Sequence, residues 1–392
     1  MTIKITILGA TGSIGKSTLD IVRQQPDHFK IVGLTTNTNI VQFEKLLKEF
    51  KPKKAVVANP DYRKELHKID GVTIISGENG LIEIAQDPDS DVVVAGIVGF
   101  AGLSSVMAAT KAGKRVLLAN KESLVCAGNL LVENCLKSNS NVIPIDSEHN
   151  AIFQCLGIEY RCFKKPQNLS KIILTASGGP FREWPAKEIK NASVKHAITH
   201  PNWAMGKKIS VDSATMINKA LEIIEAHWLF NLDSSEIDVV VHPESIIHSM
   251  IEFSDKAVLA QLGQPDMKVP IAFGLSWPRR LEMQIDGLDW KQKKLLNFEP
   301  PDYEKFPSIL LAREVLAQGG SLGAVMNAAN EVAVQSFLDE KIRFGSIVEI
   351  VADSLDKYFQ SSTRKISSLE ELVILDDSVR KFCHQLIGKN YT

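Results

Sequence analysis

The sequence predicts an α/β fold in three parts: an N-terminal doubly wound parallel sheet, a central α+β region and a helical C-terminal region. Two observations predict the sheet. Over residues 1–149, short apolar runs alternate with amphipathic stretches, which is typical of successive βα units. Most runs are continuous in Val, Ile and Leu, as expected for strands that helices cover on both faces. A third observation sets off the C-terminal part, since residues 308–392 carry apolar side chains at helical spacing only.

Seven strands are expected in the first part, with helical patterns between most of them. They span Lys4–Leu8, Lys30–Leu34, Ala55–Ala58, Val72–Ile75, Val92–Ala95, Val116–Leu118 and Val142–Ile145. The glycine-rich run Gly9-Ala10-Thr11-Gly12-Ser13-Ile14-Gly15 follows the first strand and leads into a helix over residues 14–24. Glycines at this spacing let backbone N–H groups approach a phosphate at the helix N-terminus. The run therefore predicts a Rossmann-type dinucleotide site, and the alternative is a glycine-rich turn without a ligand.

The end of the second strand bears on the choice of dinucleotide. NAD-selective sites place an Asp or Glu there to bind the ribose 2′-hydroxyl. This chain has Asn37, Thr38 and Asn39 instead. A carboxylate would repel a 2′-phosphate, so its absence favours NADP, with hydroxyl and amide groups left to bind that phosphate.

The central region, residues 150–285, has a different texture. A strand is expected over 171–175, and a polar stretch containing Trp and Pro follows over about 177–208. Its lack of periodicity predicts a long functional loop, which we interpret as a mobile lid. Beyond it we expect one helix and three β-type runs, over 211–230, 238–241, 249–253 and 257–262. The turn-rich segment 286–307 predicts a linker to a helical domain over 308–392, with a break at Gly319-Gly320.

Composition excludes several classes of partner. The 392 residues carry a formal net charge of −1, so no field is strong enough to indicate nucleic acid or an anionic membrane as partner. No apolar run approaches the roughly 20 residues that a membrane helix needs. Five cysteines lack CxxC spacing, and the N-terminus has no signal segment. We therefore expect free thiols in a protein of the reducing cytoplasm.

Paired carboxylates predict a metal site. Asp146 and Glu148 lie two residues apart at the end of the seventh strand. Oxygen ligands at this spacing suit a hard divalent cation. The long central helix supplies a third carboxylate, Glu222, with Asn218 and Lys219 on the same face. The three acids predict Mg²⁺ or Mn²⁺, and the alternative is that Lys219 and Glu222 form a surface ion pair.

Two further segments carry polar residues where ligands bind. One follows the strand at 116–118, at the edge where open α/β sheets bind ligands, and contains Asn120, Lys121 and Glu122. The alternative there is a solvated helix start. The other ends the long loop and contains His200, Trp203, Met205 and Gly206. An amphipathic Trp beside His and Met suits a lid that excludes water, and the alternative is a loop anchored by one buried Trp.

Taken in order, these motifs resemble one family over nearly the whole chain. They are Gly9–Gly15, Leu118–Ser123, Asp146–Asn150, Ser177–Arg182, His200–Trp203, Lys208–Ser213, and Asn218 and Lys219 with Glu222. The chain resembles the 1-deoxy-D-xylulose-5-phosphate reductoisomerases of the non-mevalonate isoprenoid pathway. The resemblance implies an NADPH- and divalent-metal-dependent homodimer. It implies isomerisation of 1-deoxyxylulose 5-phosphate, a sugar phosphate, to a branched aldehyde phosphate, followed by reduction to 2-C-methyl-D-erythritol 4-phosphate.

The resemblance also implies residue roles. The expected metal ligands are Asp146, Glu148 and Glu222. The expected substrate contacts are Lys121, Ser147, Glu148, Ser177, His200, Trp203, Met205, Ser213, Asn218, Lys219 and Glu222. The expected cofactor contacts are Thr11, Gly12, Ser13, Ile14, Asn37, Thr38, Asn39, Asn120, Glu122 and Gly206. Lys121, Glu148 and His200 are the expected catalytic residues, with Glu148 the candidate to move a proton because it can serve as both ligand and base. The family often has a basic stretch after the second strand, and Asn37-Thr38-Asn39 departs from it.

Two other functions compete with this one. A metal-dependent NADP enzyme that decarboxylates hydroxy acids would need a cluster of arginines near the site, and only Arg182 lies in the relevant loop. A non-catalytic nucleotide-binding protein on the same fold would bind the cofactor without metal dependence, which three matched carboxylates argue against. The β-type runs between 238 and 262 are apolar enough to supply a dimer interface.

Overall fold

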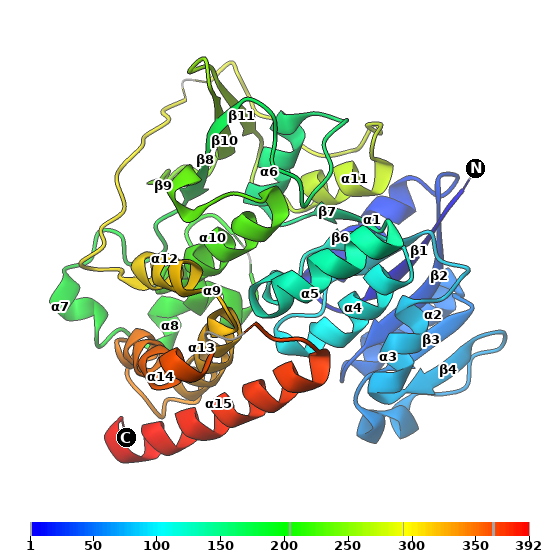
Figure 1. Ribbon diagram of the computed structural model, residues 1–392. Helices are drawn as coiled ribbons and strands as arrows, with labels where there is room; N and C mark the ends of the chain where they lie inside the picture. Colours follow the sequence, from blue (N-terminus) through cyan, green and yellow to red (C-terminus); the bar gives the residue numbers. More distant parts are fainter. Residues whose placement is uncertain (1, 204, 293, 363–364, 392) are drawn as a thin grey trace.

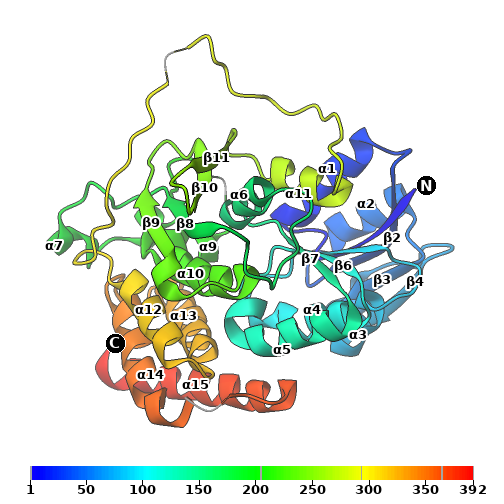
Figure 2. The same cartoon turned by 45° about the horizontal axis from the view of Figure 1, so that its top comes forward.

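The computed structural model describes residues 2–203, 205–292, 294–362 and 365–391. It has the expected α/β architecture, with a parallel sheet covered by helices, a smaller mixed sheet and a C-terminal group of helices (Figures 1 and 2). Within these ranges, no helix is both long enough and apolar enough to cross a membrane.

The parallel sheet has the order β4-β3-β2-β1-β5-β6-β7, and each strand pairs in parallel with its neighbours. Its strands are β1 Ile3–Leu8, β2 Phe29–Thr36, β3 Lys54–Val57, β4 Thr73–Ser76, β5 Val92–Ala95, β6 Arg115–Leu118 and β7 Asn141–Pro144. All seven expected strands are thereby confirmed. Strand order reverses between β1 and β5, so the crevice at their carboxyl ends is where such a sheet binds ligands.

Helices cover both faces of this sheet, as the continuous apolar strands predict. One face carries α1 Ser13–Gln24, α2 Ile40–Phe50 and α11 Lys268–Ser276, and the other carries α3 Gly77–Ala85, α4 Leu103–Lys111 and α5 Glu122–Ser138. Strand β1 feeds both cores, with Ile5 and Ile7 in one and Leu8 in the other. Helix α11 comes from the central region, and Leu117 of β6 lies so close to Gly274 that a Cβ there would be 3.1 Å from its side chain.

The second sheet has the order β11-β10-β8-β9. Its strands are β8 Leu169–Ala176, β9 Ile237–Val241, β10 Ile247–Phe253 and β11 Val258–Leu262, which confirms the four β-type runs expected after residue 150. β8 and β9 are parallel, whereas β10 is antiparallel to both β8 and β11. Helix α6, Ser147–Leu156, packs against β10 and β11 and joins this sheet to the first one.

The prediction of a single helix over 211–230 is wrong, because two helices occupy this segment. They are α9 Lys207–Ala214 and α10 Ile217–Phe230. Met216 between them has φ 60°, a left-handed conformation that ends a helix. The Thr215 hydroxyl donates to the Val211 carbonyl and accepts from Ile217 N–H, which stabilises the break. Apolar spacing continues through this break, so periodicity alone did not reveal it.

The C-terminal helices form a bundle beside α5. They are α12 Ser308–Gln318, α13 Leu322–Leu338, α14 Ser346–Ser362 and α15 Leu369–Asn390. α13 packs against α14, α15 and α5, so it lies at the centre. Gly319 and Gly320 both have positive φ and end α12 where the break was expected. The chain between α11 and α12 runs around the outside of the molecule (Figure 2) and touches β9 through the Val241–Glu299 bridge.

Candidate active site

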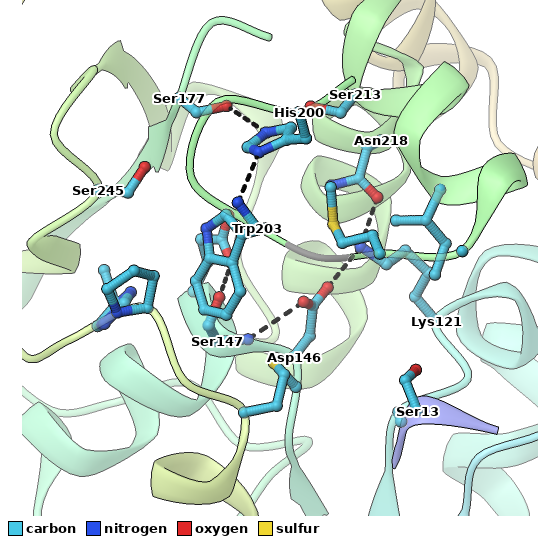
Figure 3. Close-up of a pocket in the computed structure, with 18 of the residues that line it drawn as sticks. Ser13, Lys121, Asp146, Ser147, Ser177, His200, Trp203, Ser213, Asn218 and Ser245 are labelled. Atoms are coloured by element: carbon cyan, nitrogen blue, oxygen red, sulfur yellow. Dashed lines mark hydrogen bonds and ion pairs between the residues drawn. The ribbon is translucent and has the colours of Figure 1, made fainter. Parts of the chain in front are cut away.

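A cavity of about 370 Å³ lies between the carboxyl edge of the parallel sheet and the central region. The loops after β1, β5, β6 and β7 line one side of it, and the segment before α9 with helices α9 and α10 lines the other. The long polar stretch contains two short helices, α7 Ala186–Ile189 and α8 Val194–Ala197. Of its described residues, only those at its two ends contribute to the lining, Ser177 and Gly178 on one side and His200, Trp203, Met205 and Gly206 on the other. Ser13, Asp146, His200, Trp203 and Asn218 all point into this space (Figure 3).

The three expected metal ligands meet at one wall of the cavity. Asp146 ends the β7 segment and caps α6, because its Oδ1 accepts from Ser147 N–H at 3.1 Å. Glu148 follows in the first turn of α6, and Glu222 comes from α10, where it is fully buried. One oxygen from each carboxylate lies within 4.8 Å of the others. Three converging carboxylates are a donor set that fits Mg²⁺ or Mn²⁺.

Two lysines pair with these carboxylates. Lys121 Nζ lies 2.5 Å from Asp146 Oδ2 and 3.1 Å from Glu222 Oε1, and it donates to Asn218 Oδ1 at 3.0 Å (Figure 3). Lys219 Nζ lies 2.8 Å from Glu148 Oε1 and also pairs with Glu222. Lys219 and Glu222 are therefore not a surface pair, because both are buried.

The buried charges move the pKa values of these groups in opposite directions. Burial raises the pKa of Glu148, but the ammonium of Lys219 outweighs it and lowers that pKa to about 2. Burial and the neighbouring Glu148 carboxylate raise the pKa of Glu222. Burial acts against the charge of Lys121, yet Asp146 and Glu222 raise its pKa well above the usual value. Three acids face two ammonium groups, which leaves an excess of one negative charge to attract a cation.

His200 organises the loop that faces the carboxylates. Its Nδ1 accepts from Trp203 N–H at 2.9 Å and from Asn202 N–H at 3.2 Å. A neutral ring that accepts on Nδ1 carries its proton on Nε2. Nε2 can then donate to Ser177 Oγ, 3.0 Å away. Burial lowers the pKa of His200, which favours this neutral form.

The glycine-rich loop forms the opposite wall. Gly12, Ser13 and Ile14 line the cavity at the start of α1. Gly9 has φ +83°, and a Cβ at Gly15 would lie 2.5 Å from the Gly9 carbonyl oxygen, so both positions require glycine. Backbone N–H groups at this helix start are suited to a phosphate. Thr11 lies beside this wall, with its hydroxyl 2.9 Å from that of Thr36.

The cavity brings together most of the expected site residues. Its lining includes Gly12, Ser13, Ile14, Lys121, Asp146, Ser147, Glu148, Ser177, His200, Trp203, Met205, Gly206, Ser213, Asn218 and Lys219. Glu222 reaches it through its contacts with Lys121 and Lys219.

Six expected cofactor residues lie outside the lining, and Thr11 beside the glycine-rich wall is one of them. Asn37, Thr38 and Asn39 are exposed at the end of β2, where the Asn39 side chain caps α2. Asn120 is buried behind the loop after β5, and its Nδ2 donates to the carbonyls of Ile97 and Gly99. Glu122 is buried against Lys208 at 2.8 Å. Asn120 thus supports a lining residue, Ile97.

Sequence reasoning missed several residues of the lining. They include Gly96, Ile97, Val98, Ser245, His248, Asp266 and Met267. The ring of His248 lies 6.0 Å from that of Trp203 at the cavity. The polar segment between β9 and β10 was the available signal, because a polar turn at a sheet end commonly carries function. His149 and His242, by contrast, are fully buried outside the lining.

Three family models match the chain. The model described as "1-deoxy-D-xylulose 5-phosphate reductoisomerase" matches residues 5–128. The model of that family's C-terminal domain matches residues 142–230, and the model described as "DXP reductoisomerase C-terminal domain" matches residues 262–382. Together these ranges cover most of the chain.

Relatives and solved structures agree with the family models. The 1-deoxy-D-xylulose 5-phosphate reductoisomerases of Chloroherpeton thalassium and Ralstonia nicotianae are each 47% identical, over 97% of both chains and 98% of both chains respectively. A crystal structure of DOX-P reductoisomerase with NADPH, fosmidomycin and magnesium superposes with a TM-score of 0.93 at 44% identity, over 98% of both chains. The Zymomonas mobilis enzyme with NADPH gives a TM-score of 0.89 at 41% identity, over the same share of both chains. The chain therefore belongs to the 1-deoxy-D-xylulose 5-phosphate reductoisomerase family.

Proposed function

We infer that the cavity is the active site of an NADPH- and divalent-metal-dependent oxidoreductase. The chain isomerises 1-deoxy-D-xylulose 5-phosphate and reduces the product to 2-C-methyl-D-erythritol 4-phosphate, in the non-mevalonate route to isoprenoid precursors. One observation carries the assignment to this cavity: a cluster of three carboxylates, two of them on the lining, adjoins the same space as a glycine-rich phosphate loop and a polar cluster for a second phosphate. The family's solved complexes with NADPH, fosmidomycin and magnesium support it.

We assign the cation to Asp146, Glu148 and Glu222. When bound there, it supplies the Lewis acid that polarises the substrate's carbonyl and adjacent hydroxyl. The competing oxidative decarboxylation of a hydroxy acid would need arginines to hold a second carboxylate. None lines the cavity within the described ranges of the chain, which argues against that chemistry.

The substrate's phosphate is assigned to the polar side chains beside the carboxylates. Ser177 and Ser213 offer hydroxyls, Asn218 an amide and Lys219 an ammonium group, all on the lining. Charge-assisted hydrogen bonds of this kind hold a phosphate firmly. Firm attachment matters because a carbon–carbon bond must break and re-form, most simply by retro-aldol cleavage and re-addition, and the two fragments must stay in register.

The lid residues keep both fragments in place. His200 fixes the backbone at Asn202 and Trp203, so the indole of Trp203 is held against the cavity. Asn202 is itself tied to the polar turn after β9, because its Nδ2 donates to Pro243 O at 2.6 Å. Trp203 and Met205 then exclude water while the fragments recombine. The nicotinamide is assigned to the side formed by Ser13, Ile14 and Gly206.

Proton removal is assigned to Glu148, and the ion pair with Lys219 sets how strong a base Glu148 is. A pKa of about 2 makes Glu148 a weak base as long as Lys219 is paired with it. When Lys219 turns to the substrate's phosphate, Glu148 loses one of the positive charges that lower its pKa, whereas a cation bound at Glu148 would still favour the carboxylate. Ser147 Oγ donates to Glu148 Oε2 at 2.5 Å and can pass the proton on.

We propose four regions with separate roles: a cofactor domain over 1–149, a catalytic and dimerisation domain over 150–285 with its lid at about 177–208, a linker over 286–307, and a helical domain over 308–392. The carboxyl edge of the first sheet and the lining residues of the second region support the first two roles.

We also propose a homodimer that works in the cytoplasm. β11 is an edge strand of the second sheet, and Val258 and Leu259 on it are 48% and 47% exposed. An exposed apolar edge is a surface that a second copy would cover. All five cysteines are free thiols, which supports a reducing compartment.

A steady-state turnover assay of one variant and one matched control provides the test. Glu222→Gln should lower kcat at saturating Mg²⁺ by about 100-fold or more, since Lewis-acid stabilisation is worth several kcal/mol. NADPH affinity should stay within about twofold, because Glu222 is not on the cofactor side. NADPH oxidation with deoxyxylulose phosphate, with and without chelator, and with NADH in place of NADPH, measures each requirement. Glu133→Gln, an exposed position on α5, is the control, and full turnover by Glu222→Gln would refute the ligand assignment.

A further inference from the structure

The half-buried ammonium group of Lys208 joins three parts of the chain outside the cavity. Lys208 Nζ lies 2.8 Å from Glu122 Oε1 and 2.8 Å from Asp212 Oδ2. Glu122 begins α5 beside the cofactor wall, Asp212 lies in α9, and Asp212 Oδ1 accepts from Asn330 Nδ2 of α13 at 2.8 Å. Glu122 is 5% exposed and Asp212 1% exposed. Neither carboxylate nor Lys208 lines the cavity.

This cluster continues to the cofactor wall. Asn120 Nδ2 lies 3.3 Å from Glu122 Oε2, and it holds the carbonyls of Ile97 and Gly99 at 2.7 and 2.9 Å. Ile97 lines the cavity opposite the lid. A chain of contacts thus runs from Lys208 through Glu122 and Asn120 to the loop after β5.

On its other side, Lys208 stands at the end of the lid segment. Gly206 is two residues away and lines the cavity, and Lys208 itself lies in the first turn of α9. Both carboxylates that pair with Lys208 are buried, so water does not compete strongly for these ion pairs. Burial raises the pKa of Glu122, but Lys208 outweighs it and lowers that pKa, so the carboxylate is held charged.

We propose that Lys208 is a positioning residue that sets the lid relative to the cofactor loop. It touches neither the substrate cavity nor the cofactor wall, and it acts by holding Glu122 of the cofactor domain and Asp212 of the catalytic domain at one fixed separation. Glu122 then acts through Lys208 and Asn120, without contacting the cofactor. The proposal rests on the assignment of the cavity as the active site.

The decisive variant removes one positive and one negative charge together, so that the net charge of the cluster does not change. Lys208→Met alone leaves two buried carboxylates unpaired and can fail to fold. The double variant Lys208→Met/Asp212→Asn removes one positive and one negative charge, and its melting temperature shows whether it is folded. In the folded double variant, KM for NADPH should rise and kcat should fall, each by about tenfold or more, because a displacement remote from the chemistry misplaces the reacting atoms. Lys208→Arg, which keeps the cation, should restore most of the activity.

Lys207→Met is the matched control, since Lys207 is the exposed neighbour on the same turn and should behave as the parent enzyme does. A folded double variant with both constants within twofold of the parent would overturn the proposal.

A second measurement separates an indirect role of Glu122 from direct cofactor contact. If Glu122 and Asp212 act through the same ammonium group, the effects of Glu122→Gln and Asp212→Asn on KM for NADPH should not multiply in the double variant. If the two effects multiply, Glu122 acts independently of Lys208 and the positioning role is wrong. Failure of the cavity assignment itself would appear separately, as an active Glu222→Gln enzyme.

Discussion

The chemistry of the site depends on how a few buried charges are paired. Asp146, Glu148 and Glu222 would repel one another strongly if they were alone. Lys121 and Lys219 offset that repulsion from two sides. If either lysine moves away, the carboxylate that it pairs with loses a counter-charge. The site is therefore held together by the same lysines that are assigned to the substrate, so binding of the substrate redistributes these ion pairs.

A second layer of charge lies directly behind this one. His149 Nδ1 lies 3.0 Å from Glu225 Oε2, and its Nε2 lies 3.0 Å from the Glu222 carbonyl oxygen. Burial lowers the pKa of His149, but Glu225 and the nearby carboxylates outweigh it and raise that pKa to about 9. The imidazolium therefore braces the backbone that carries a metal ligand.

This charge predicts a pH dependence of stability. The pKa of His149 is about 9 in the folded state and near 6.5 in the unfolded state, so the folded state binds the extra proton between these values. The free energy of unfolding should then fall by about 2 kcal/mol from pH 6.5 to pH 8.5 in chelator. Urea unfolding at several pH values measures this. Burial lowers the pKa values of His200 and His248, so these two histidines affect stability only below this window.

The control for that measurement is the neutral pair His149→Gln/Glu225→Gln, which keeps a polar contact but cannot titrate. Its unfolding free energy should change much less across the same window. An equal slope in both proteins would show that another group is responsible.

At the level of elements, close packing between α5 and α10 places Glu222. Gly128 of α5 faces the indole of Trp228 on α10, and a Cβ at this position would overlap the ring. Only glycine lets the two helices approach this closely. The position of α10 in turn sets Glu222 against the carboxylates of α6.

Gly128→Ala should therefore destabilise the protein by about 1–3 kcal/mol, because the added methyl group overpacks a filled contact. It should also reduce turnover, since α10 carries Asn218, Lys219 and Glu222. Gly388→Ala is the control, because that glycine lies in α15 with open space around it. The control should be neutral or stabilised by about 0.5–1 kcal/mol. Urea unfolding and turnover of both variants provide the test.

Sequence patterns identified most elements but not their ends. The strands of both sheets were predictable because continuous or alternating apolar runs have few other uses. The break at Met216 was not, because a left-handed residue between two helices leaves the apolar spacing unchanged. The carboxylates of Asp146 and Glu148 were predictable from their place after a strand, whereas His248 was not, since its role depends on contact with the distant Trp203.

At the scale of the whole molecule, exposed apolar side chains occur on the edge strand of the second sheet and on the chain between α11 and α12. Val258 and Leu259 lie on the edge strand β11, and Trp290 on the outer segment is 68% exposed. Edge strands offer unpaired backbone groups to a neighbouring chain. These features support assembly through this face, on the side of the molecule away from the C-terminal helices (Figure 1).

If the proposed homodimer forms through this face, Val258→Lys/Leu259→Lys should convert it to a monomer, because each chain would bury two charges at the interface. Light scattering after size-exclusion chromatography measures the mass directly. Val41→Lys is the control, because Val41 is 74% exposed on α2, in the other domain. A variant that keeps the parent's mass would place the interface elsewhere, and a parent that is monomeric at all concentrations would refute the dimer.

The contact between Phe100 and Glu331 affects when the loop after β5 becomes fully stabilised during synthesis of the chain. Phe100 N–H donates to Glu331 Oε1 at 2.9 Å across 231 residues of chain, and Arg380 pairs with the same carboxylate at 2.6 Å. The loop after β5 therefore acquires its last support only when helices α13 and α15 have left the ribosome. Contacts this distant in sequence form late and slowly. The nascent cofactor domain can form its sheet early, but the finished nucleotide site is a product of the completed chain.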